Sequence, residues 1–335
     1  MLNMLNPLSS AKHKHYLRGC FTVTVGYLTL VWYNQCSKIQ GVMVMHKVNA
    51  KQLLSSDNGM NIYRGCTHGC IYCDARSKCY QMNHAFEDVE VKENAPIILE
   101  EKLKRKRKKA MIATGAMSDP YIPEEKQLLK TKACLEVIEK YGFGLCIQTK
   151  SNLILRDLDL LKAINKKSKC VVQMTLTTAD INLCRKIEPN VCTTDKRVEA
   201  LKIFASNGIP TVVWLCPFLP FINDTEENIV SLMRQCVDAG VKGIICYGIG
   251  VTLREGSREH FYKQLDYKFP GLKYKYINHY GNSYELLSPN NEKLMKIIAA
   301  ECENNGIMLG NDKVFEYMKT YQSNEYIQMD LFDLM

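Results

Sequence analysis

Three cysteines stand within eight positions of the segment YRGCTHGCIYCDAR, residues 63–76. Cys66, Cys70 and Cys73 follow the spacing C-x3-C-x2-C, which suits a metal ion or an iron–sulfur cluster. A structural zinc site would need a fourth ligand, which His68 or Cys79 could supply. A thioredoxin-like redox pair would leave the third cysteine without a role. An iron–sulfur cluster normally takes four thiolates, so three would leave one iron of a [4Fe–4S] cube open to another ligand.

From residue 60 onward, short apolar runs alternate with amphipathic helical patterns. The run before Cys66 is the first predicted strand, and the others cover residues 110–115, 143–149, 170–177, 209–216 and 243–249. Strands that alternate with helices at this spacing predict βα units and a parallel sheet. About six units are too few for a closed eight-stranded barrel, so we predict an α/β fold, an open partial TIM barrel with the cysteine loop after its first strand. Its chemistry should lie at the carboxyl ends of the strands.

Composition is that of a globular protein, with 46% hydrophobic and 24% charged residues. The formal net charge of +9 is compatible with an anionic partner such as nucleic acid. The fifteen cysteines are odd in number and mostly stand singly in apolar runs, as Cys146 and Cys246 do. This pattern does not suggest disulfides, so we expect a cytoplasmic, reducing environment.

The first part of the chain needs a separate interpretation. Residues 19–37 are uncharged and follow Lys12, Lys14 and Arg18, which resembles a signal peptide or a short membrane anchor. Their strand-like composition and the missing small-residue cleavage site argue against both, and we expect a translation start at Met43 or Met45 and no membrane attachment. The predicted organisation is an N-terminal extension (1–45), a core (46–255) and a C-terminal extension with helices and a terminal tail (256–335).

The cysteine motif, with Tyr72 before its last cysteine, resembles the signature of radical S-adenosylmethionine (SAM) enzymes. The segments YRGCTHGCIYCDAR, GAMSDPYIPEE, TKSNLILRDLDLL, KIEP and CPFLPFINDTEEN together resemble the spore photoproduct lyase-like family of that superfamily, which is DNA repair photolyase-like. The resemblance spans about residues 48–332 and leaves the first forty-odd residues outside it.

The resemblance implies a [4Fe–4S] cluster on Cys66, Cys70 and Cys73, with the amino and carboxylate groups of SAM on the fourth iron. An electron from a reductant such as flavodoxin or ferredoxin would cleave SAM into methionine and a 5′-deoxyadenosyl radical, which abstracts hydrogen from the substrate. The family's SAM contacts correspond to Tyr72 beside the adenine, Ser118 and Asp119 at the amino group, Lys150 at the carboxylate, and Thr175. Each could instead be a capping, turn or surface residue.

The sequence departs from the lyase at one position. The family resemblance implies a cysteine hydrogen donor two residues before the Ser–Asp pair, and Ala116 stands there. Cys146 or Cys79 could substitute for it. We therefore expect a protein other than the lyase itself, with its exact reaction open.

Three segments bear on the substrate. Arg254 and Arg258 follow the sixth predicted strand and are the expected substrate contacts. The run KLKRKRKK, residues 102–109, is expected to be a solvated face. Residues 271–284, GLKYKYINHYGNSY, alternate as an amphipathic edge strand would, although cations among aromatic rings also suit single-stranded nucleic acid.

The C-terminal segment QMDLF, residues 328–332, resembles the short peptide by which bacterial repair proteins dock on the DNA sliding clamp. Leu331 and Phe332 would fill an apolar pocket while Gln328 forms a hydrogen bond beside it. Alternatively, the tail folds back and buries these residues on its own barrel.

Two classes of function follow. The first is a radical SAM enzyme that acts on nucleic acid, in a DNA-repair-like reaction. The alternatives are a metal- or cluster-containing nucleic-acid-binding protein without radical chemistry, and a radical SAM enzyme that acts on a protein or a small molecule.

Overall fold

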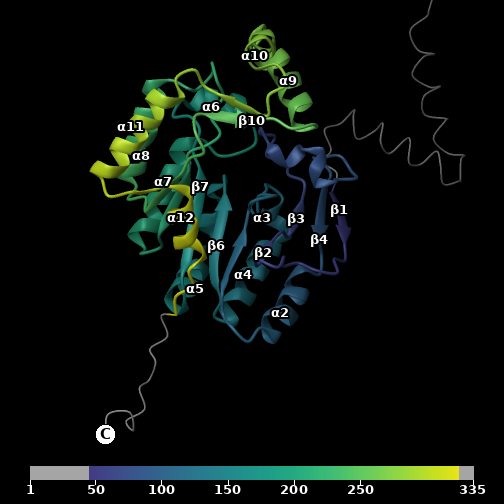
Figure 1. Cartoon of the computed structure of the whole chain (residues 1–335). Helices are drawn as coiled ribbons and strands as arrows, with labels where there is room; N and C mark the ends of the chain where they lie inside the picture. The colour runs from purple at the N-terminus through teal and green to yellow at the C-terminus, as the bar shows by residue number, and fades with distance from the viewer. Residues whose placement is uncertain (1–44, 324–335) are drawn as a thin grey trace, which may run out of the picture. The chain divides into compact units, whose positions relative to one another are not determined.

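The structure is a computed structural model that describes residues 45–323, which belong to one compact unit of the chain. Its main element is a seven-stranded parallel sheet in the order β12-β9-β8-β7-β6-β5-β2 (Figure 1). The order is linear, so the sheet does not close on itself. Its strands are β2 (Gly59–Met60), β5 (Met111–Thr114), β6 (Gly144–Thr149), β7 (Cys170–Thr175), β8 (Thr211–Trp214), β9 (Gly243–Ile245) and β12 (Met308–Leu309).

Five of the predicted strands are β5 to β9 of this sheet, and the open partial-barrel prediction is confirmed. The run before Cys66 is divided between β2, which belongs to this sheet, and β3 (Tyr63–Arg64), which belongs to another. β12, a two-residue strand that pairs with β9, is an edge strand that the sequence pattern did not reveal. Strands β6 and β7 are buried along almost their whole length. Parallel strands that are buried on both faces are typically nearly continuous apolar runs, as these two are. The part of the chain after residue 255 therefore contributes directly to the barrel.

The helices between the strands pack on one another in succession around the outer face of the sheet. Helix α2 contacts α4, α4 contacts α5, α7 contacts α8, and α8 contacts α11. The helices are α2 (Ala95–Arg105), α3 (Glu125–Leu128), α4 (Lys130–Lys140), α5 (Leu158–Lys167), α6 (Ile181–Ile187), α7 (Thr194–Ser206), α8 (Glu226–Asp238), α9 (Ser257–Lys268), α10 (Leu272–Tyr280), α11 (Asn291–Asn304) and α12 (Asn311–Lys319), with 3₁₀ turns at Asp74–Arg76, Lys78–Tyr80 and Asn152–Asp157.

The inner face of the sheet is filled at one end only. Val314 and Met318 of α12 pack against an apolar cluster formed by one inward residue from each of five neighbouring strands. Because side chains alternate between the two faces of a strand, the residues two and four positions further along also face inward. They form the other, carboxyl end of the inner face. The apolar cluster on the strands consists of Met111, Cys146, Val171, Val212 and Ile245.

Two smaller sheets flank the barrel. Strands β1 (Met45–Val48), β4 (Val89–Lys92) and β3 (Tyr63–Arg64) form a three-stranded sheet before and after the cysteine loop. Strands β10 (Gly250–Thr252) and β11 (Glu285–Leu287) pair antiparallel beside α9 and α10 (Figure 1).

One expectation about local structure was wrong. Residues 271–284 contain the helix α10 instead of an edge strand, because burial of Tyr276 against Phe261 provides one packed face at helical spacing. Helix α8 is capped by Thr225, whose side chain accepts a hydrogen bond from the Asn228 N–H. The neighbouring Asp224 accepts a hydrogen bond from the Ser288 hydroxyl.

Several predictions concern residues outside the described range. The N-terminal extension up to residue 44 and the proposed docking residues Gln328, Leu331 and Phe332 lie there, so these remain predictions. Within residues 45–323, none of the helices has the length and apolar character needed to cross a membrane.

Candidate active site at the carboxyl edge of the sheet

A cavity of about 650 Å³ lies where the parallel strands end. Side chains alternate between the two faces of a strand. The inward-facing side chains beyond those that pack against α12 therefore form part of the cavity wall. The cysteine loop supplies another part of the wall. The residues contributed by the strand ends are Gly115, Gln148, Lys150, Thr175, Trp214, Cys216 and Tyr247.

All three cysteines of the motif line this cavity. Cys66 and Cys70 are buried and Cys73 is partly buried. The loop that carries them is held by backbone contacts: the Cys66 N–H donates to the Phe86 carbonyl at 3.1 Å. The Ile71 N–H donates to the Ile187 carbonyl at 3.0 Å, on the far side of the cavity.

The three thiols do not form the tight group that a single metal ion needs. Around one tetrahedral zinc ion, thiolate sulfurs lie roughly 3.8 Å apart. Ligand atoms of three residues that could share one metal ion would lie within 4.8 Å of one another. Among residues 45–323 such a group exists elsewhere, and the three cysteines do not form one. A [4Fe–4S] cube binds each thiolate on a separate iron and so accepts wider spacing.

Burial also affects the protonation of the loop thiols. Burial raises the pKa of each of the three thiols, that of Cys70 to about 12. The nearby Lys150 ammonium acts in the opposite direction on Cys70 and Cys73. Burial therefore favours the neutral thiols, and the ionised form that a metal ligand needs would require compensating positive charge, which metal ions supply. The residues present fit an iron–sulfur cluster.

Lys150 is positioned by Asp119. The carboxylate of Asp119 accepts hydrogen bonds from the Lys150 N–H at 2.8 Å, the Thr149 hydroxyl at 2.6 Å and the Tyr121 N–H at 2.8 Å. Burial lowers the pKa of Lys150, but Cys70, Glu188 and Asp119 outweigh it and raise the pKa overall, so the side chain stays charged. Its Nζ lies 6.0 Å from the ring centroid of Tyr72.

The other predicted SAM contacts also reach the cavity. Tyr72, Ser118, Asp119 and Thr175 all line it, and the Ser118 hydroxyl donates to the Gly65 carbonyl at 2.5 Å. The structure therefore brings together every residue that the resemblance assigned to cluster or SAM binding.

A buried ion pair beneath the cavity was missed by the sequence analysis. Glu188 and Arg197 are fully buried and form a salt bridge, and the Tyr72 hydroxyl donates to the Glu188 carboxylate. Burial raises the pKa of Glu188, but Arg197 and Lys150 outweigh this and hold it below its ordinary value. Arg197 also donates to the Thr175 carbonyl at 2.8 Å. Glu188 stands in the KIEP segment that carried the resemblance, which was the available signal.

Aromatic side chains around the cavity were missed as well. Trp214 ends β8, and Tyr247 lies just after the neighbouring strand β9. Their ring centroids are 6.3 Å apart. Tyr284 lines the cavity from the segment before β11, and its hydroxyl oxygen accepts a hydrogen bond from Arg254 Nη2 at 2.7 Å. The rule that barrel sites lie at strand ends could have identified the first two.

The two predicted substrate arginines separate in the structure. Arg254 lines the cavity, where its guanidinium also lies 3.6 Å from the carboxylate of Asp74. Arg258 is not among the lining residues, because its guanidinium donates to the carbonyls of Leu253 and Ser283 at 2.8 and 2.6 Å.

The alternative thiol donors are also absent from the cavity wall that the structure describes. Cys146 lies in the apolar cluster under α12, and Cys79 is exposed beside Arg254. Ala116 does line the cavity, so its methyl group stands where the resemblance implied a thiol. Cys216, which the sequence analysis did not single out, lines it too.

The fold and the site define an α/β partial-barrel protein that could hold a metal cluster and a nucleotide-sized ligand at the carboxyl edge of its sheet. Residues 60–233, about half of the chain, match the family model described as the radical SAM superfamily. The chain therefore belongs to the radical SAM superfamily. Its cofactors are a [4Fe–4S] cluster and SAM, and its chemistry is that of a radical SAM enzyme.

Relatives of the chain include proteins with no assigned function. An uncharacterised protein of Methanocaldococcus jannaschii is 36% identical over 194 residues, covering 57% of this chain and 72% of that protein. An uncharacterised protein of Mycobacterium bovis is 28% identical over 251 residues, covering 72% of each. Among solved structures, spore photoproduct lyase complexed with a dinucleoside spore photoproduct has a TM-score of 0.56 at 14% identity, covering 79% of this chain and 81% of the other. This similarity shows the shared fold.

We predict that Arg197→Met destabilises the protein by about 3–5 kcal/mol, because it leaves the Glu188 carboxylate buried without its cation. Urea unfolding followed by circular dichroism measures the change. The matched control is Arg185→Met, at an exposed site on α6, which should stay within about 0.5 kcal/mol of the parent.

The same pair predicts a pH dependence. The pKa of Glu188 is lower in the folded protein than its ordinary value of 4.5, so its contribution to stability is present above pH 4.5 and is lost as the pH falls through the folded-state pKa. The Glu188→Gln variant should lack this part of the acid destabilisation. Two results together would contradict a stabilising ion pair. The free energy of unfolding would fall equally with pH in the parent and in Glu188→Gln, and Arg197→Met would leave it unchanged.

Proposed function

We propose that this radical SAM enzyme acts on nucleic acid, on a base held at the mouth of the cavity. The observation that carries the proposal is that one cavity combines the cysteine loop and Lys150 with exposed aromatic rings and an arginine at its rim. The cysteine loop and Lys150 suit the cofactors, and the aromatic rings with the arginine suit a stacked base next to a phosphate.

Cys66, Cys70 and Cys73 are the proposed ligands of the [4Fe–4S] cluster, and the fourth iron is left for SAM. When bound, the cluster and SAM supply a carbon radical that abstracts hydrogen from the substrate. Lys150 would pair with the SAM carboxylate, and Asp119 would position Lys150 through its backbone N–H. Ser118 and Thr175 are proposed polar contacts, and the buried Tyr72 a wall for the adenine.

Three features support a nucleic-acid substrate. Tyr247 is 60% exposed although it lines the cavity, which leaves its ring free to stack on a base. Arg254 lies over the Tyr284 ring at 5.1 Å, so a cation and an aromatic face are presented together. The chain also carries a net charge of +9. Spore photoproduct lyase, which shares the fold, has been solved with a dinucleoside photoproduct bound.

The proposed reaction is DNA-repair-like but differs from that of the lyase. Ala116 offers no exchangeable hydrogen at the cavity wall, so the donor implied for the lyase is missing. A reductant such as flavodoxin or ferredoxin would deliver the electron. A lyase-like bond cleavage on DNA therefore requires a different hydrogen donor.

The ligand assignment predicts the iron content of cysteine variants. Protein purified without oxygen should contain about four irons per chain. Changing Cys66, Cys70 or Cys73 to Ala should remove the cluster and its visible absorption, whereas Cys79→Ala, at an exposed thiol outside the cavity, should keep both. Iron loss in the Cys79 variant, or zinc in place of iron in the parent, would overturn the assignment.

The Lys150→Ala variant should bind SAM about ten- to a hundred-fold more weakly, because it loses a charged hydrogen bond worth about 1.5–3 kcal/mol. Isothermal titration of anaerobic, cluster-loaded protein measures this affinity. Lys162→Ala, at an exposed position of α5, is the control and should bind SAM like the parent. Unchanged SAM affinity with full iron content in Lys150→Ala would show that this residue is misplaced in the proposal.

The substrate proposal predicts that single-stranded DNA binds and raises the rate of 5′-deoxyadenosine formation above that seen with peptides. Tyr247→Ala should weaken oligonucleotide binding by about 1–3 kcal/mol, the range for loss of one base stack. Fluorescence anisotropy measures the affinity and chromatography measures the deoxyadenosine. The control is Tyr267→Ala, which removes an 83% exposed tyrosine that does not line the cavity. Equal binding by both variants would argue against stacking at this rim.

A further inference from the structure

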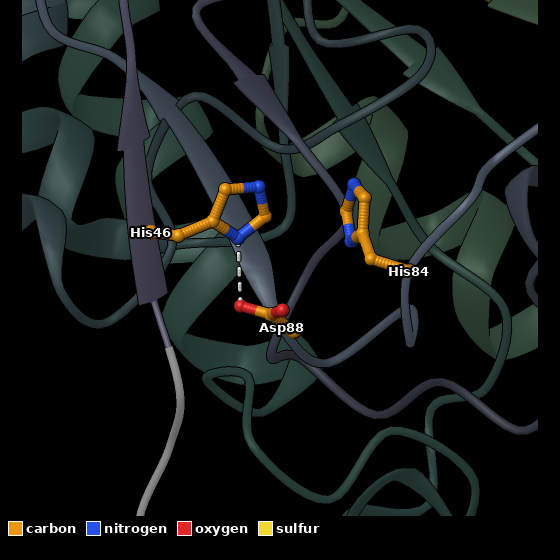
Figure 2. Close-up of side chains that lie close together, drawn as sticks. All are labelled: His46, His84 and Asp88. Atoms are coloured by element: carbon orange, nitrogen blue, oxygen red, sulfur yellow. Dashed lines mark hydrogen bonds and ion pairs between the residues drawn. The ribbon is translucent and has the colours of Figure 1, made fainter. Parts of the chain in front are cut away.

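Outside the cavity, His46, His84 and Asp88 converge beside the three-stranded sheet (Figure 2). One ligand atom from each residue lies within 4.8 Å of the other two, and all three residues are partly buried. His46 belongs to β1, while His84 and Asp88 belong to the loop that leads into β4. None of them lines the cavity.

The ring of His84 has one nitrogen without a hydrogen-bond partner among the described residues. Its Nδ1 lies 3.0 Å from the Ala85 carbonyl oxygen, which can only accept, so Nδ1 carries the proton and donates. The lone pair is then on Nε2, which is buried and has no hydrogen-bond partner among the described residues. A histidine whose other nitrogen donates to a backbone carbonyl is the usual arrangement of a metal-bound imidazole.

His46 adds a second imidazole and brings two carboxylates with it. Its Nδ1 lies 2.9 Å from Asp88 Oδ1, and its Nε2 lies 4.0 Å from Glu90 Oε2. The parallel pairing of β1 with β4 sets His46 opposite Glu90. The His46 and His84 rings meet edge to face, with centroids 4.9 Å apart.

We infer that these residues bind a zinc ion. Two imidazole nitrogens and a carboxylate oxygen form a donor set that zinc favours, whereas calcium and magnesium prefer oxygen ligands alone. Zinc–nitrogen bonds of about 2.0–2.1 Å place tetrahedral ligands roughly 3.3 Å apart. The three ligand atoms, which lie within 4.8 Å of one another, would have to move closer by side-chain rotation, and water or Glu90 would complete the coordination.

The zinc ion would stabilise the segment whose backbone binds the cysteine loop. His84 and Asp88 lie on either side of Phe86, whose carbonyl accepts the Cys66 N–H at 3.1 Å. A zinc ion bound to both residues and to His46 ties this loop to β1 and fixes the position of that carbonyl. The inferred site is thus structural, and it is separate from the cluster and from the substrate.

The test uses the full chain, reconstituted with iron without oxygen, exposed to zinc sulfate and passed through a desalting column. Elemental analysis should give about one tightly bound zinc per chain. X-ray absorption at the zinc edge should show nitrogen and oxygen neighbours with imidazole scattering. His84→Ala and the nearly isosteric Asp88→Asn should each lower zinc affinity at least tenfold in competition with a chromophoric chelator, without changing iron content.

Two controls separate this site from others. His279→Ala removes a histidine of α10 that contacts Phe221, and it should bind zinc like the parent. A variant with Cys66, Cys70 and Cys73 all changed to Ala should lose iron and keep the zinc. A sulfur shell around zinc, zinc loss in the cysteine variant, or zinc binding unchanged in both His84→Ala and Asp88→Asn would each overturn the inference. Because Asp88→Asn preserves shape, circular dichroism of that variant distinguishes lost ligation from lost folding.

Discussion

The site depends on one constraint, the alternation of side chains along parallel strands that end at a common edge. Each inward row of the sheet begins with an apolar residue under α12 and ends with a residue of the cavity wall. Along β6, for example, Cys146 packs under the helix, and the same row continues to Gln148 and Lys150 at the cavity. Since the sheet is open and only one end of its inner face is filled, a cavity remains at the other end.

Charge is the second constraint on this cavity. Three buried thiols, Glu188 and Asp119 are all groups whose ionised forms are costly to bury. Lys150 and Arg197 are the cations that face them, and each interacts with more than one of these groups. The ion pair between Glu188 and Arg197 holds the Tyr72 hydroxyl from below, while its arginine also binds the carbonyl at the end of β7. These contacts hold two residues of the cavity wall, Tyr72 and Thr175, in place.

Backbone contact, in turn, fixes the cysteine loop. Gly65 has a φ of +90°, and a Cβ there would lie 2.5 Å from the Phe86 carbonyl oxygen. Gly115, at the end of the row from β5, has a φ of +102° and passes so close to Gln148 that a Cβ would overlap its carbonyl oxygen. Only glycine fits such close approaches at positive φ. The inferred zinc ion would hold the same Phe86 segment from its other side.

The sequence by itself predicted the five longer strands of the main sheet, their parallel arrangement and the cysteine motif of the superfamily, because these depend on local periodicity and on spacing within one loop. Lys150 and Thr175 could be assigned from the resemblance, and their place at strand ends agrees with it. Only the tertiary structure decided that Glu188 pairs with Arg197, that Tyr247 and Tyr284 reach the same cavity, and that Arg258 turns away to bind carbonyls. It also decided that residues 272–280 are helical, because packing of Tyr276 against Phe261 overrides an alternating pattern that is ambiguous on its own. These outcomes depend on contacts between residues far apart in the chain, and such contacts have no local signal.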